Sequence, residues 1–340
     1  MIRRLFAALL TFVVVFPLAA WGTLALWLRL PFGPLGRGLV CALWLTGLAV
    51  VVVLAWRHRW KPAAALFIAM LIAQFGWWAT IRPSNYRDWQ PDLARVATTH
   101  IDGDVLTVNN VRNFRWRSDT DFDQRWERRR YRLSQLQGAD LFLSYWAGES
   151  VAHAIISFDF ADSDPLAFSI EIRKQRGQAY ETVAGFFKTY ELAVIAADER
   201  DVVKVRSTVR GEDVRLYRLD IERATALALL RQYAELANDV ARRPRWYNTV
   251  AENCTTVIFG MAHRLDPAIG LDWRILLPGK LPSYLQEHSF VTRRLSLVEL
   301  TRRSHIGPRA AGPDPDPGFS ARIREGVPRP GTRDVAAASG

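Results

Sequence analysis

Cysteine is almost absent from this chain of 340 residues, which contains only Cys41 and Cys254. Two thiols cannot build the disulfide framework on which many small secreted domains depend. Cys41 lies in the apolar run LVCALWLTG, where a cysteine is expected to pack as a small buried side chain. A disulfide between the two would have to join an apolar segment to a polar domain. We therefore expect both cysteines to remain thiols.

Acidic residues are missing from the first part of the chain, where no Asp or Glu precedes Asp88. Three apolar runs lie there, at about 5–28, 39–56 and 63–81, and each is near the roughly 20 residues that a helix needs to cross a bilayer. Turn-like segments separate them, and tryptophans lie near their ends. We predict a transmembrane region of three helices over 1–81, because the first run is longer than the core of a cleaved signal peptide.

Positive charge in the short loops predicts the orientation of these helices. With a cytoplasmic amino terminus, most of the flanking cations fall inside, namely Arg3, Arg4, Arg57, Arg59 and Lys61. Three spans then deliver everything after Ile81 to the far side, which in a bacterium is the periplasm. The chain is thus expected to be a multi-pass protein of the inner membrane, with Cys254 a lone thiol in an oxidising compartment. This topology excludes nucleic acid as a partner, despite a net charge of +11.

The polar part divides into three segments. The first, 82–139, is basic and contains a hairpin that turns at Asp-Gly in IDGDVLTVNN. The second, 140–305, has short strands of alternating polarity and then two helical stretches, which predicts an α+β domain with an antiparallel sheet. The third, 306–340, is rich in proline, glycine and small polar residues and is expected to be a disordered tail.

Two features of the first polar segment have competing interpretations. The basic stretch DFDQRWERRRYRL is either an ordinary solvated face or a contact with anionic lipid head groups. His100, Asp102 and Asp104 have a metal-ligand composition, but the hairpin turn explains them better. We therefore expect no metal site.

Cys254 lies in the stretch YNTVAENCTT, at the predicted start of a helix. Amide groups and the helix dipole at that position lower the pKa of a thiol, and such amides can also hold an oxyanion. Asn253 and Thr255 are good capping residues, however, so a purely structural helix cap explains them too. A buried structural cysteine is the further alternative.

A cysteine nucleophile needs a base, and His153 is the best placed of the six histidines. It begins the strand AHAIISFDF, from which it could reach a thiol on a packed helix, whereas His263 falls on the opposite helix face from Cys254. If the next strand pairs antiparallel with this one, Glu171 could orient the imidazole as the third member of a triad. The alternatives are a structural core histidine, and an ion pair of Glu171 with Arg173.

These motifs are similar to those of a known family. His153 on a strand followed by a cysteine in YNTVAENCTT resembles the circularly permuted papain-like proteins, which include lecithin–retinol acyltransferase relatives and permuted NlpC/P60 hydrolases. NVRNFRW, AHAIISFDF, SIEIRKQRG, GFFKTYELAVIAADERDVVKVR and YNTVAENCTT resemble more closely the Lnb-type bacterial lipoprotein N-acyltransferase family. The likeness extends from about Asn110 to LLPGKLPSYL and implies a permuted papain-like fold for the periplasmic domain.

The resemblance implies a thioester mechanism. Cys254 would attack a phospholipid ester after His153 takes its proton, and the amino group of a lipoprotein's terminal cysteine would then accept the acyl chain. A phospholipid donor, a lipoprotein acceptor and the membrane are the implied partners, and no cofactor is expected. Residues implied in substrate contact are Tyr190, Tyr247, Asn253, Glu199 and Arg200, although salt-bridged scaffold is an alternative for the charged ones.

Two other functions remain open at this stage. The same Cys-His constellation could belong to a peptidase or amidase that acts on cell-wall peptides. The chain could also be a non-enzymatic membrane-tethered domain, in which Cys254 and His153 are buried structure.

Overall fold

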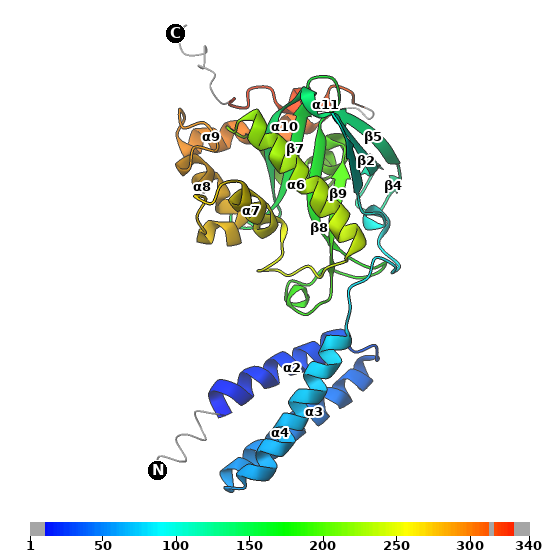
Figure 1. Cartoon of the computed structure of the whole chain (residues 1–340), viewed down its shortest axis with the longest axis vertical. Helices are drawn as coiled ribbons and strands as arrows, with labels where there is room; N and C mark the ends of the chain where they lie inside the picture. The colour runs from blue at the N-terminus through cyan, green and yellow to red at the C-terminus, as the bar shows by residue number, and fades with distance from the viewer. Residues whose placement is uncertain (1–10, 313–315, 330–340) are drawn as a thin grey trace. The chain divides into compact units, whose positions relative to one another are not determined.

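The computed structural model describes residues 11–312 and 316–329. The chain divides into two compact units. The first contains the chain up to Ser84 together with the short segments Tyr180–Glu191 and Trp246–Asn248, and the second contains the remaining residues. Figure 1 labels the helices and strands of both.

Three long apolar helices make up most of the first unit. They are α2 (Phe16–Arg29), which continues the short π-helix η1 (Thr11–Val15), then α3 (Pro34–Trp56) and α4 (Trp60–Thr80). The spans Phe12–Arg29, Pro34–Trp56 and Trp60–Thr80 are long and apolar enough to cross a membrane, the first of them by combining α2 with most of η1. The three membrane-length helices predicted from the sequence are confirmed, except that 5–10 lie outside the described residues.

Helices α2 and α3 pack closely because Gly22 leaves room for the indole of Trp44. A Cβ atom at Gly22 would lie 2.6 Å from that ring, well inside van der Waals contact. Leu26 and Leu48 belong to the same buried cluster. Cys41 lies there as well, as the sequence predicted for a small apolar side chain. Both cysteines of the chain are thiols without a disulfide.

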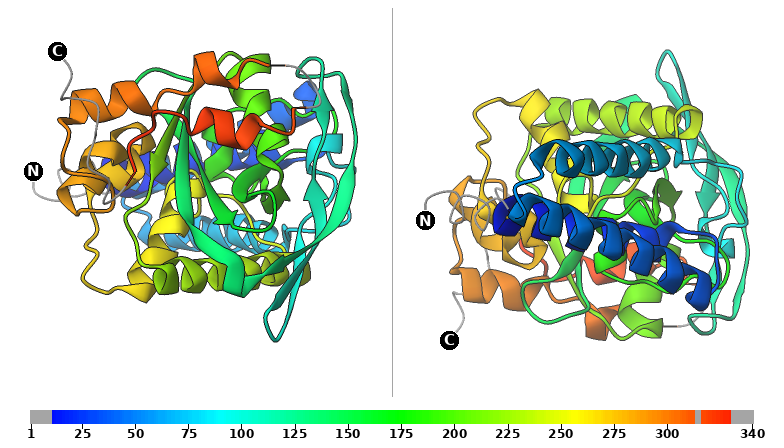
Figure 2. Two further views of the ribbon diagram at one scale, coloured as in Figure 1. Left: turned by 90° about the horizontal axis from the view of Figure 1, so that it is seen from above. Right: turned by 90° about the horizontal axis from the view of Figure 1, so that it is seen from below.

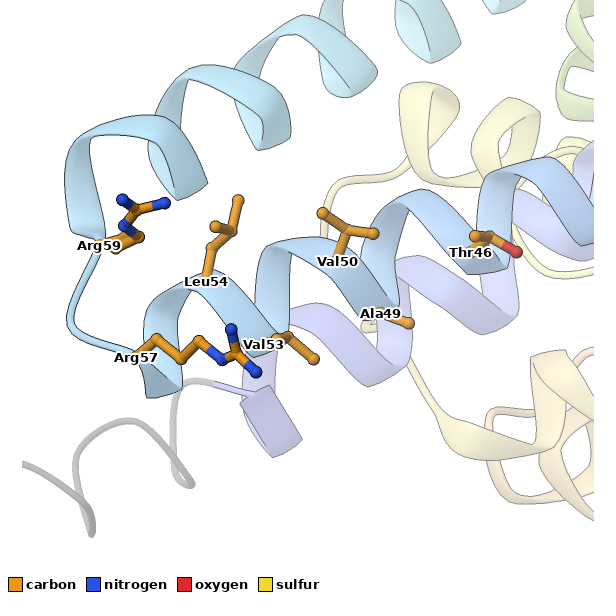
Figure 3. A pocket seen from close by; sticks show the side chains of 7 residues that line it. All are labelled: Thr46, Ala49, Val50, Val53, Leu54, Arg57 and Arg59. Carbon is orange, nitrogen blue, oxygen red and sulfur yellow. The ribbon is translucent and has the colours of Figure 1, made fainter.

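A hollow of about 490 Å³ lies along α3 near its turn into α4. Successive turns of α3 supply its apolar wall, and two arginines stand at the turn (Figure 3). The lining residues are Thr46, Ala49, Val50, Val53, Leu54, Arg57 and Arg59.

Two loops from later in the chain complete the first unit. The ammonium of Lys188 lies 4.7 Å from the centre of the Trp78 ring and donates to the Trp78 carbonyl at 2.8 Å. The guanidinium of Arg29 lies 5.4 Å from the ring centre of Trp246. Cation–π contacts therefore attach both loops to the ends of the membrane-length helices.

One large sheet forms the second unit. Its strands are β1 (Thr98–Asp102), β2 (Val105–Arg112), β5 (Trp126–Arg132), β6 (Leu136–Tyr145), β7 (Ala152–Phe160), β8 (Leu166–Arg173), β9 (Glu191–Ala197) and β10 (Asp213–Arg218). Their order is β1-β2-β9-β8-β7-β6-β10, with β5 paired to β2. A separate two-stranded sheet contains β3 (Arg115–Trp116) and β4 (Phe122–Asp123).

The predicted α+β architecture is confirmed, with two corrections. The sheet is mixed and not purely antiparallel, because β9 lies between β2 and β8 and pairs parallel with β2 at Arg112 and Ala197. The predicted hairpin exists as β1 and β2, with Gly103 in the left-handed region at φ 54°. This hairpin joins the large sheet, so 82–139 contributes strands to the main unit and is not merely a connecting segment.

Helices cover both faces of the sheet. On one face, Phe142 and Ile155 pack in a buried cluster with Phe319. On the other face, Tyr233 stacks on Phe168 with ring centres 5.1 Å apart. Figure 2, seen from above, shows the helices on the two sides of the strands. These helices are α5 (Glu199–Val202), α6 (Arg223–Arg242), α7 (Cys254–Leu265), α8 (Leu281–Glu287), α9 (Leu297–Ser304), α10 (Gly307–Ala310) and α11 (Phe319–Ile323).

The prediction of a disordered tail over 306–340 is wrong for the residues described there. Phe319 and Ile323 are fully buried in the core cluster, so the segment is part of the fold. A composition rich in proline and glycine predicted disorder, but a few well-spaced apolar side chains are enough to anchor such a segment. Residues 313–315 and 330–340 lie outside the described part of the chain.

Arg324, just after α11, ties this segment to the sheet. Its guanidinium lies 2.9 Å from Asp140, 2.8 Å from Asp159 and 2.6 Å from Glu199. Arg218 of β10 pairs with two of the same carboxylates, those of Asp140 and Asp159, at 2.7 Å each. Two arginines and three carboxylates thus form one buried network.

Candidate active site

Cys254 is the first residue of α7, as the sequence predicted. The side-chain oxygen of Asn253 accepts from the amides of Thr255 and Thr256 at 2.9 Å each. The Thr256 hydroxyl accepts from the amide of Asn253 at 3.0 Å, which completes a capping box. The cap therefore occupies the amides of Thr255 and Thr256. The sequence had suggested that amides at this helix start could hold an oxyanion, but these two are already hydrogen-bonded.

His153 and Glu171 lie on neighbouring antiparallel strands, β7 and β8. The ladder pairs Ile155 with Ser169, and the same register two residues further on sets His153 opposite Glu171. Side chains opposite each other across a ladder share one face of the sheet. Nε2 of His153 lies 3.2 Å from Oε1 of Glu171. The predicted antiparallel pairing is confirmed, and Glu171 lies where it can orient the imidazole.

Ser169 determines which nitrogen of the imidazole carries a proton. Its hydroxyl donates to Oε1 of Glu171 at 2.6 Å and lies 2.7 Å from Nε2 of His153. A hydroxyl has a single hydrogen, so with that hydrogen on the carboxylate the oxygen must accept from Nε2–H. Nδ1 is then the ring nitrogen that is left for the thiol.

Arg206 holds the carboxylate of Glu171 from the other side. It belongs to the short π-helix η5 (Val205–Val209), a kind of element that often marks functional sites. The guanidinium donates to Oε1 of Glu171 at 2.9 Å. Burial by itself raises the pKa of Glu171, but the imidazole of His153 and this guanidinium bring it well below its usual range. Glu171 is therefore ionised.

The thiol of Cys254 and the imidazole of His153 lie close enough for their charges to interact, with Cys254 buried and His153 largely buried. Burial opposes the imidazolium, but the carboxylate of Glu171 and the sulfur charge outweigh it and raise the pKa of His153 to about 9. Burial also opposes the thiolate, yet the imidazolium lowers the pKa of the Cys254 thiol below its ordinary value. The geometry therefore favours a thiolate–imidazolium ion pair, the reactive form of a cysteine nucleophile.

The sulfur has further hydrogen-bond donors around it. The amide of Ala154 lies near it, and the ladder between β7 and β8 begins only at Ile155. The hydroxyl of Thr255 lies 3.8 Å from Sγ. Both contacts help to lower the pKa of the Cys254 thiol.

Tyr233 of α6 presents an unused donor close to the nucleophile. The residue is fully buried, and its hydroxyl has no hydrogen-bond partner among the described residues. Burial, together with the charge of Cys254, raises the pKa of Tyr233 well above its usual value. The hydroxyl thus keeps its proton. A buried polar group without a partner is uncommon and calls for an explanation, such as a ligand that completes the site.

Three residues predicted to contact substrate have structural partners. Asn253 is the helix cap described above. Glu199 accepts from Ser157 at 2.5 Å in addition to its pairing with Arg324. Arg200 pairs with Asp198 at 2.6 Å, and with Asp164 as well. Salt-bridged scaffold, the alternative that the sequence left open, describes both charged residues, and their contact with substrate stays a prediction.

The two tyrosines predicted to contact substrate lie together in the first unit. The amide of Tyr247 donates to the carbonyl of Tyr190 at 2.9 Å. The hydroxyl of Tyr190 accepts from the amide of Glu181 at 2.7 Å. Cys254 belongs to the second unit, so a role for either tyrosine at the thiol also stays a prediction.

Sequence reasoning missed three residues of the site. Ser169 had a usable signal, because it lies two residues before Glu171 on the same strand and hence on the same face. Arg206 had none, since a π-helix of five residues has no sequence signature. Tyr233 lies on the apolar stripe of an amphipathic helix and is indistinguishable there from a core aromatic.

Comparison with known proteins gives one match. Residues 122–279 match the family described as the Lnb N-terminal periplasmic domain, and this range includes His153, Glu171 and Cys254. No curated protein and no solved structure matches the chain. Together with the three membrane-length helices, the match describes a membrane-anchored protein with a periplasmic domain.

Proposed function

We propose that the chain, whose residues 122–279 match the Lnb N-terminal periplasmic domain, is a membrane-anchored periplasmic cysteine acyltransferase. It transfers a fatty acyl chain from a phospholipid, through a thioester on Cys254, to the terminal amine of a lipoprotein. The observation that carries the proposal is the buried Cys254–His153 pair, with Glu171 behind the imidazole. The order of His153 before Cys254 supports a circularly permuted papain-like arrangement of these groups.

The first half of the reaction forms the acyl-enzyme. The thiolate of Cys254 attacks the ester carbonyl carbon of a phospholipid, and a new carbon–sulfur bond forms as the carbonyl oxygen becomes an oxyanion. The oxyanion collapses, the ester carbon–oxygen bond breaks, and the imidazolium of His153 gives its proton to the departing alkoxide. The products are a thioester on the enzyme and a lysophospholipid, and His153 is left neutral.

The second half transfers the chain to an amine. The terminal amino group of the acceptor attacks the thioester carbonyl, and neutral His153 takes a proton from the attacking nitrogen. The carbon–sulfur bond breaks, an amide forms, and the thiolate–imidazolium pair is restored. Glu171 and Ser169 hold the imidazole in one orientation through both halves.

The oxyanion needs donors, and the site supports two. The first-turn amides of Thr255 and Thr256 are taken by the cap, which leaves the amide of Cys254 itself. The hydroxyl of Tyr233, which has no hydrogen-bond partner within residues 11–312 and 316–329, is the second candidate. Donors aligned in advance in a buried site stabilise developing charge more effectively than water does.

The membrane anchor supports a lipid substrate. A domain tethered to a bilayer meets phospholipids and lipoproteins at a high effective concentration. The cations of the turn between α3 and α4 favour an orientation with that turn in the cytoplasm. Three spans then make the chain a multi-pass protein of the inner membrane, with Cys254 in the periplasm.

Intact-mass spectrometry of the full-length protein in detergent micelles tests the proposal. Incubation with a phosphatidylethanolamine of defined chains is expected to add the mass of one acyl group, which neutral hydroxylamine removes as it does other thioesters. Cys254→Ala is expected to abolish the adduct, whereas Cys41→Ala, the matched control, retains it. A diacylglyceryl-cysteine peptide is then expected to discharge the enzyme and gain an amide-linked chain.

Two further assays on the same protein, turnover of cell-wall peptides and alkylation of Cys254, distinguish the peptidase and the non-enzymatic alternatives. An unmodified enzyme that releases products from cell-wall peptides without any lipid would be a peptidase or amidase, and the acyltransferase proposal would be wrong. A Cys254 thiol that resists alkylation in the folded protein, with no adduct and no peptide turnover, would indicate a non-enzymatic domain.

A further inference from the structure

A large apolar cavity lies beside Cys254, entirely within the second unit. Its volume is about 580 Å³, and α6, α7 and α8 together with β6 and β7 contribute to its wall. Figure 1 shows these three helices on one side of the sheet. Ala154 and Thr255, two residues beside the sulfur, are both part of the lining. The cavity therefore begins where the reaction takes place.

One face of α7 forms a continuous wall of this cavity. Thr255, Ile258, Ala262 and Leu265 all line it, and their spacing places them on the same side of the helix. Ten residues separate the first from the last, which corresponds to roughly 15 Å of helix at the usual rise. The cavity thus runs from the nucleophile along most of the length of α7.

Small side chains on α6 leave this space open. Ala224 and Ala228, one helical turn apart, face the cavity opposite α7. Apolar cavities of this kind remain dry and take up apolar ligands, as an engineered cavity of about 150 Å³ takes up benzene, or roughly 25 Å³ per carbon. On that scale the cavity of about 580 Å³ accommodates roughly 20 carbons. This is enough for one long acyl chain and too little for two.

We propose that this cavity binds the fatty acyl chain that Cys254 carries as a thioester. The inference rests on the proposed acyltransferase function. It adds the feature of the substrate that the enzyme recognises, a single apolar chain of up to about 20 carbons on the scale just given. With the chain in the cavity, its carbonyl carbon lies at the sulfur, between the donors and the imidazole. The chain therefore positions the reacting ester and sets a limit on its length.

A surface loop beside the cavity gives a lipid chain access to it. The segment between α7 and α8 turns Ile269 and Ile275 inward, where both line the cavity. The same segment exposes Leu271 and Trp273, which are 82 % and 62 % accessible. Neighbouring exposed apolar side chains of this size are typical of surfaces that contact lipid. The loop thus joins an apolar surface to an apolar interior.

Chain-length selectivity of the full-length protein tests the proposal. Acylation of Cys254 is measured with p-nitrophenyl octanoate and p-nitrophenyl palmitate in the same mixed micelles, so that partitioning is common to all variants. Ala262→Trp places a large ring about midway along the cavity. Ala268→Trp, on the exposed turn after α7, is the matched control because it does not line the cavity.

The wild type is expected to gain up to about fourfold in kcat/KM for each methylene that enters the cavity. In Ala262→Trp, the kcat/KM for the octanoate ester is expected to stay within about twofold of the wild-type value. The kcat/KM for the palmitate ester is expected to fall at least tenfold, because each methylene that the ring excludes from the cavity no longer contributes its burial energy. Ala228→Phe, which fills the cavity from α6, is expected to act in the same direction. Equal loss with both esters, or palmitate selectivity retained in both variants, would overturn the proposal.

A binding measurement separates this proposal from the proposed function. Cys254→Ala cannot form a thioester, yet its cavity is intact, so it is expected to bind a palmitate analogue with a photoreactive diazirine on the chain. Labelling is expected on the peptide that contains Ile258 and Ala262, and Ala262→Trp is expected to abolish it. Binding without any acylation in the wild type would reject the transferase and keep the cavity. Acylation of the wild type without labelling of this peptide would reject the cavity as the chain-binding site and keep the transferase.

Discussion

Replacing Glu171 with glutamine isolates the contribution of its charge to the thiolate–imidazolium pair. Glu171→Gln keeps the shape of the side chain but removes the negative charge that lies 3.2 Å from Nε2 of His153. Arg206, which lies 2.9 Å from the same carboxylate oxygen, then loses the nearer of its two counter-charges. Both changes disfavour the imidazolium, so the pKa of His153 must fall and the pKa of the Cys254 thiol must rise.

The size of the effect follows from the distance. Two unit charges 3.2 Å apart interact by about 5 kcal/mol at an effective dielectric constant of about 20, which is an upper bound. An opposite charge this close ordinarily shifts a pKa by about one to three units. The pKa of His153, about 9 in the wild type, is therefore expected to fall to between about 6 and 8 in Glu171→Gln.

The sign of the pH effect follows from the step that needs the proton. In the proposed mechanism the imidazolium protonates the leaving alkoxide, so acylation is expected to be lost as pH rises through the pKa of His153. In the wild type this alkaline limb is expected near pH 9. In Glu171→Gln it moves down by about one to three units, and at pH 8 the acylation rate falls by about twofold to a hundredfold.

The assay is the rate of acyl-enzyme formation against pH, followed by intact mass after rapid quenching. Alkylation of Cys254 by iodoacetamide at pH 6 is a second readout that needs no lipid, and it is expected to slow in Glu171→Gln. Glu212→Gln is the matched control, because Glu212 also contacts Arg206, at 3.5 Å, but is not paired with His153. An alkaline limb that stays near pH 9 in Glu171→Gln would refute the assignment of this carboxylate as the group that holds the imidazolium.

Three further variants test separate parts of the molecule. Tyr233→Phe is expected to slow acylation by about 10²- to 10³-fold as an oxyanion donor is lost; the midpoint of urea unfolding should not fall, because the hydroxyl has no partner among the described residues. Arg324→Met leaves buried carboxylates uncompensated and is expected to lower the free energy of unfolding by about 3–5 kcal/mol; the exposed Arg117→Met, in the same urea titration, should show no measurable change. Asn253→Ala removes the cap of α7 and is expected to cost about 1 kcal/mol in that titration, whereas an unchanged midpoint would mean that the cap does not stabilise the helix.

Long apolar runs and the alternation of apolar with polar residues were enough to predict most helices and strands of this fold. The membrane-length helices are set by local composition, because bilayer thickness dictates how long an apolar run must be. The strands that carry His153 and Glu171 are predicted by the alternation of apolar and polar residues, which also predicts the face of the strand on which each side chain lies. The start of α7 at Cys254 follows from the capping chemistry of Asn253, which acts within four residues.

The tail and the sheet order show the limits of local signals. A segment rich in proline and glycine predicted disorder, yet Phe319 and Ile323 gain burial from residues more than a hundred positions away. The position of β9 between β2 and β8 could not be predicted either, because several strands have a similar pattern of apolar residues and any of them could pair there. Neither outcome is encoded in a short window, because the stabilising surface belongs to another part of the chain.

By itself, the sequence determined the membrane-length helices and the α+β class, and it predicted that Cys254 and His153 form the site, since each of these depends on residue type and short spacing. Only the tertiary structure decided that Ser169 and Arg206 contact Glu171 and that an apolar cavity opens beside Cys254. It also decided that the Tyr233 hydroxyl, near the thiol, has no hydrogen-bond partner in the described part of the chain. These features arise where elements distant in sequence pack together. Charges, donors and empty space acquire their effect from burial, and burial is a property of the folded chain as a whole.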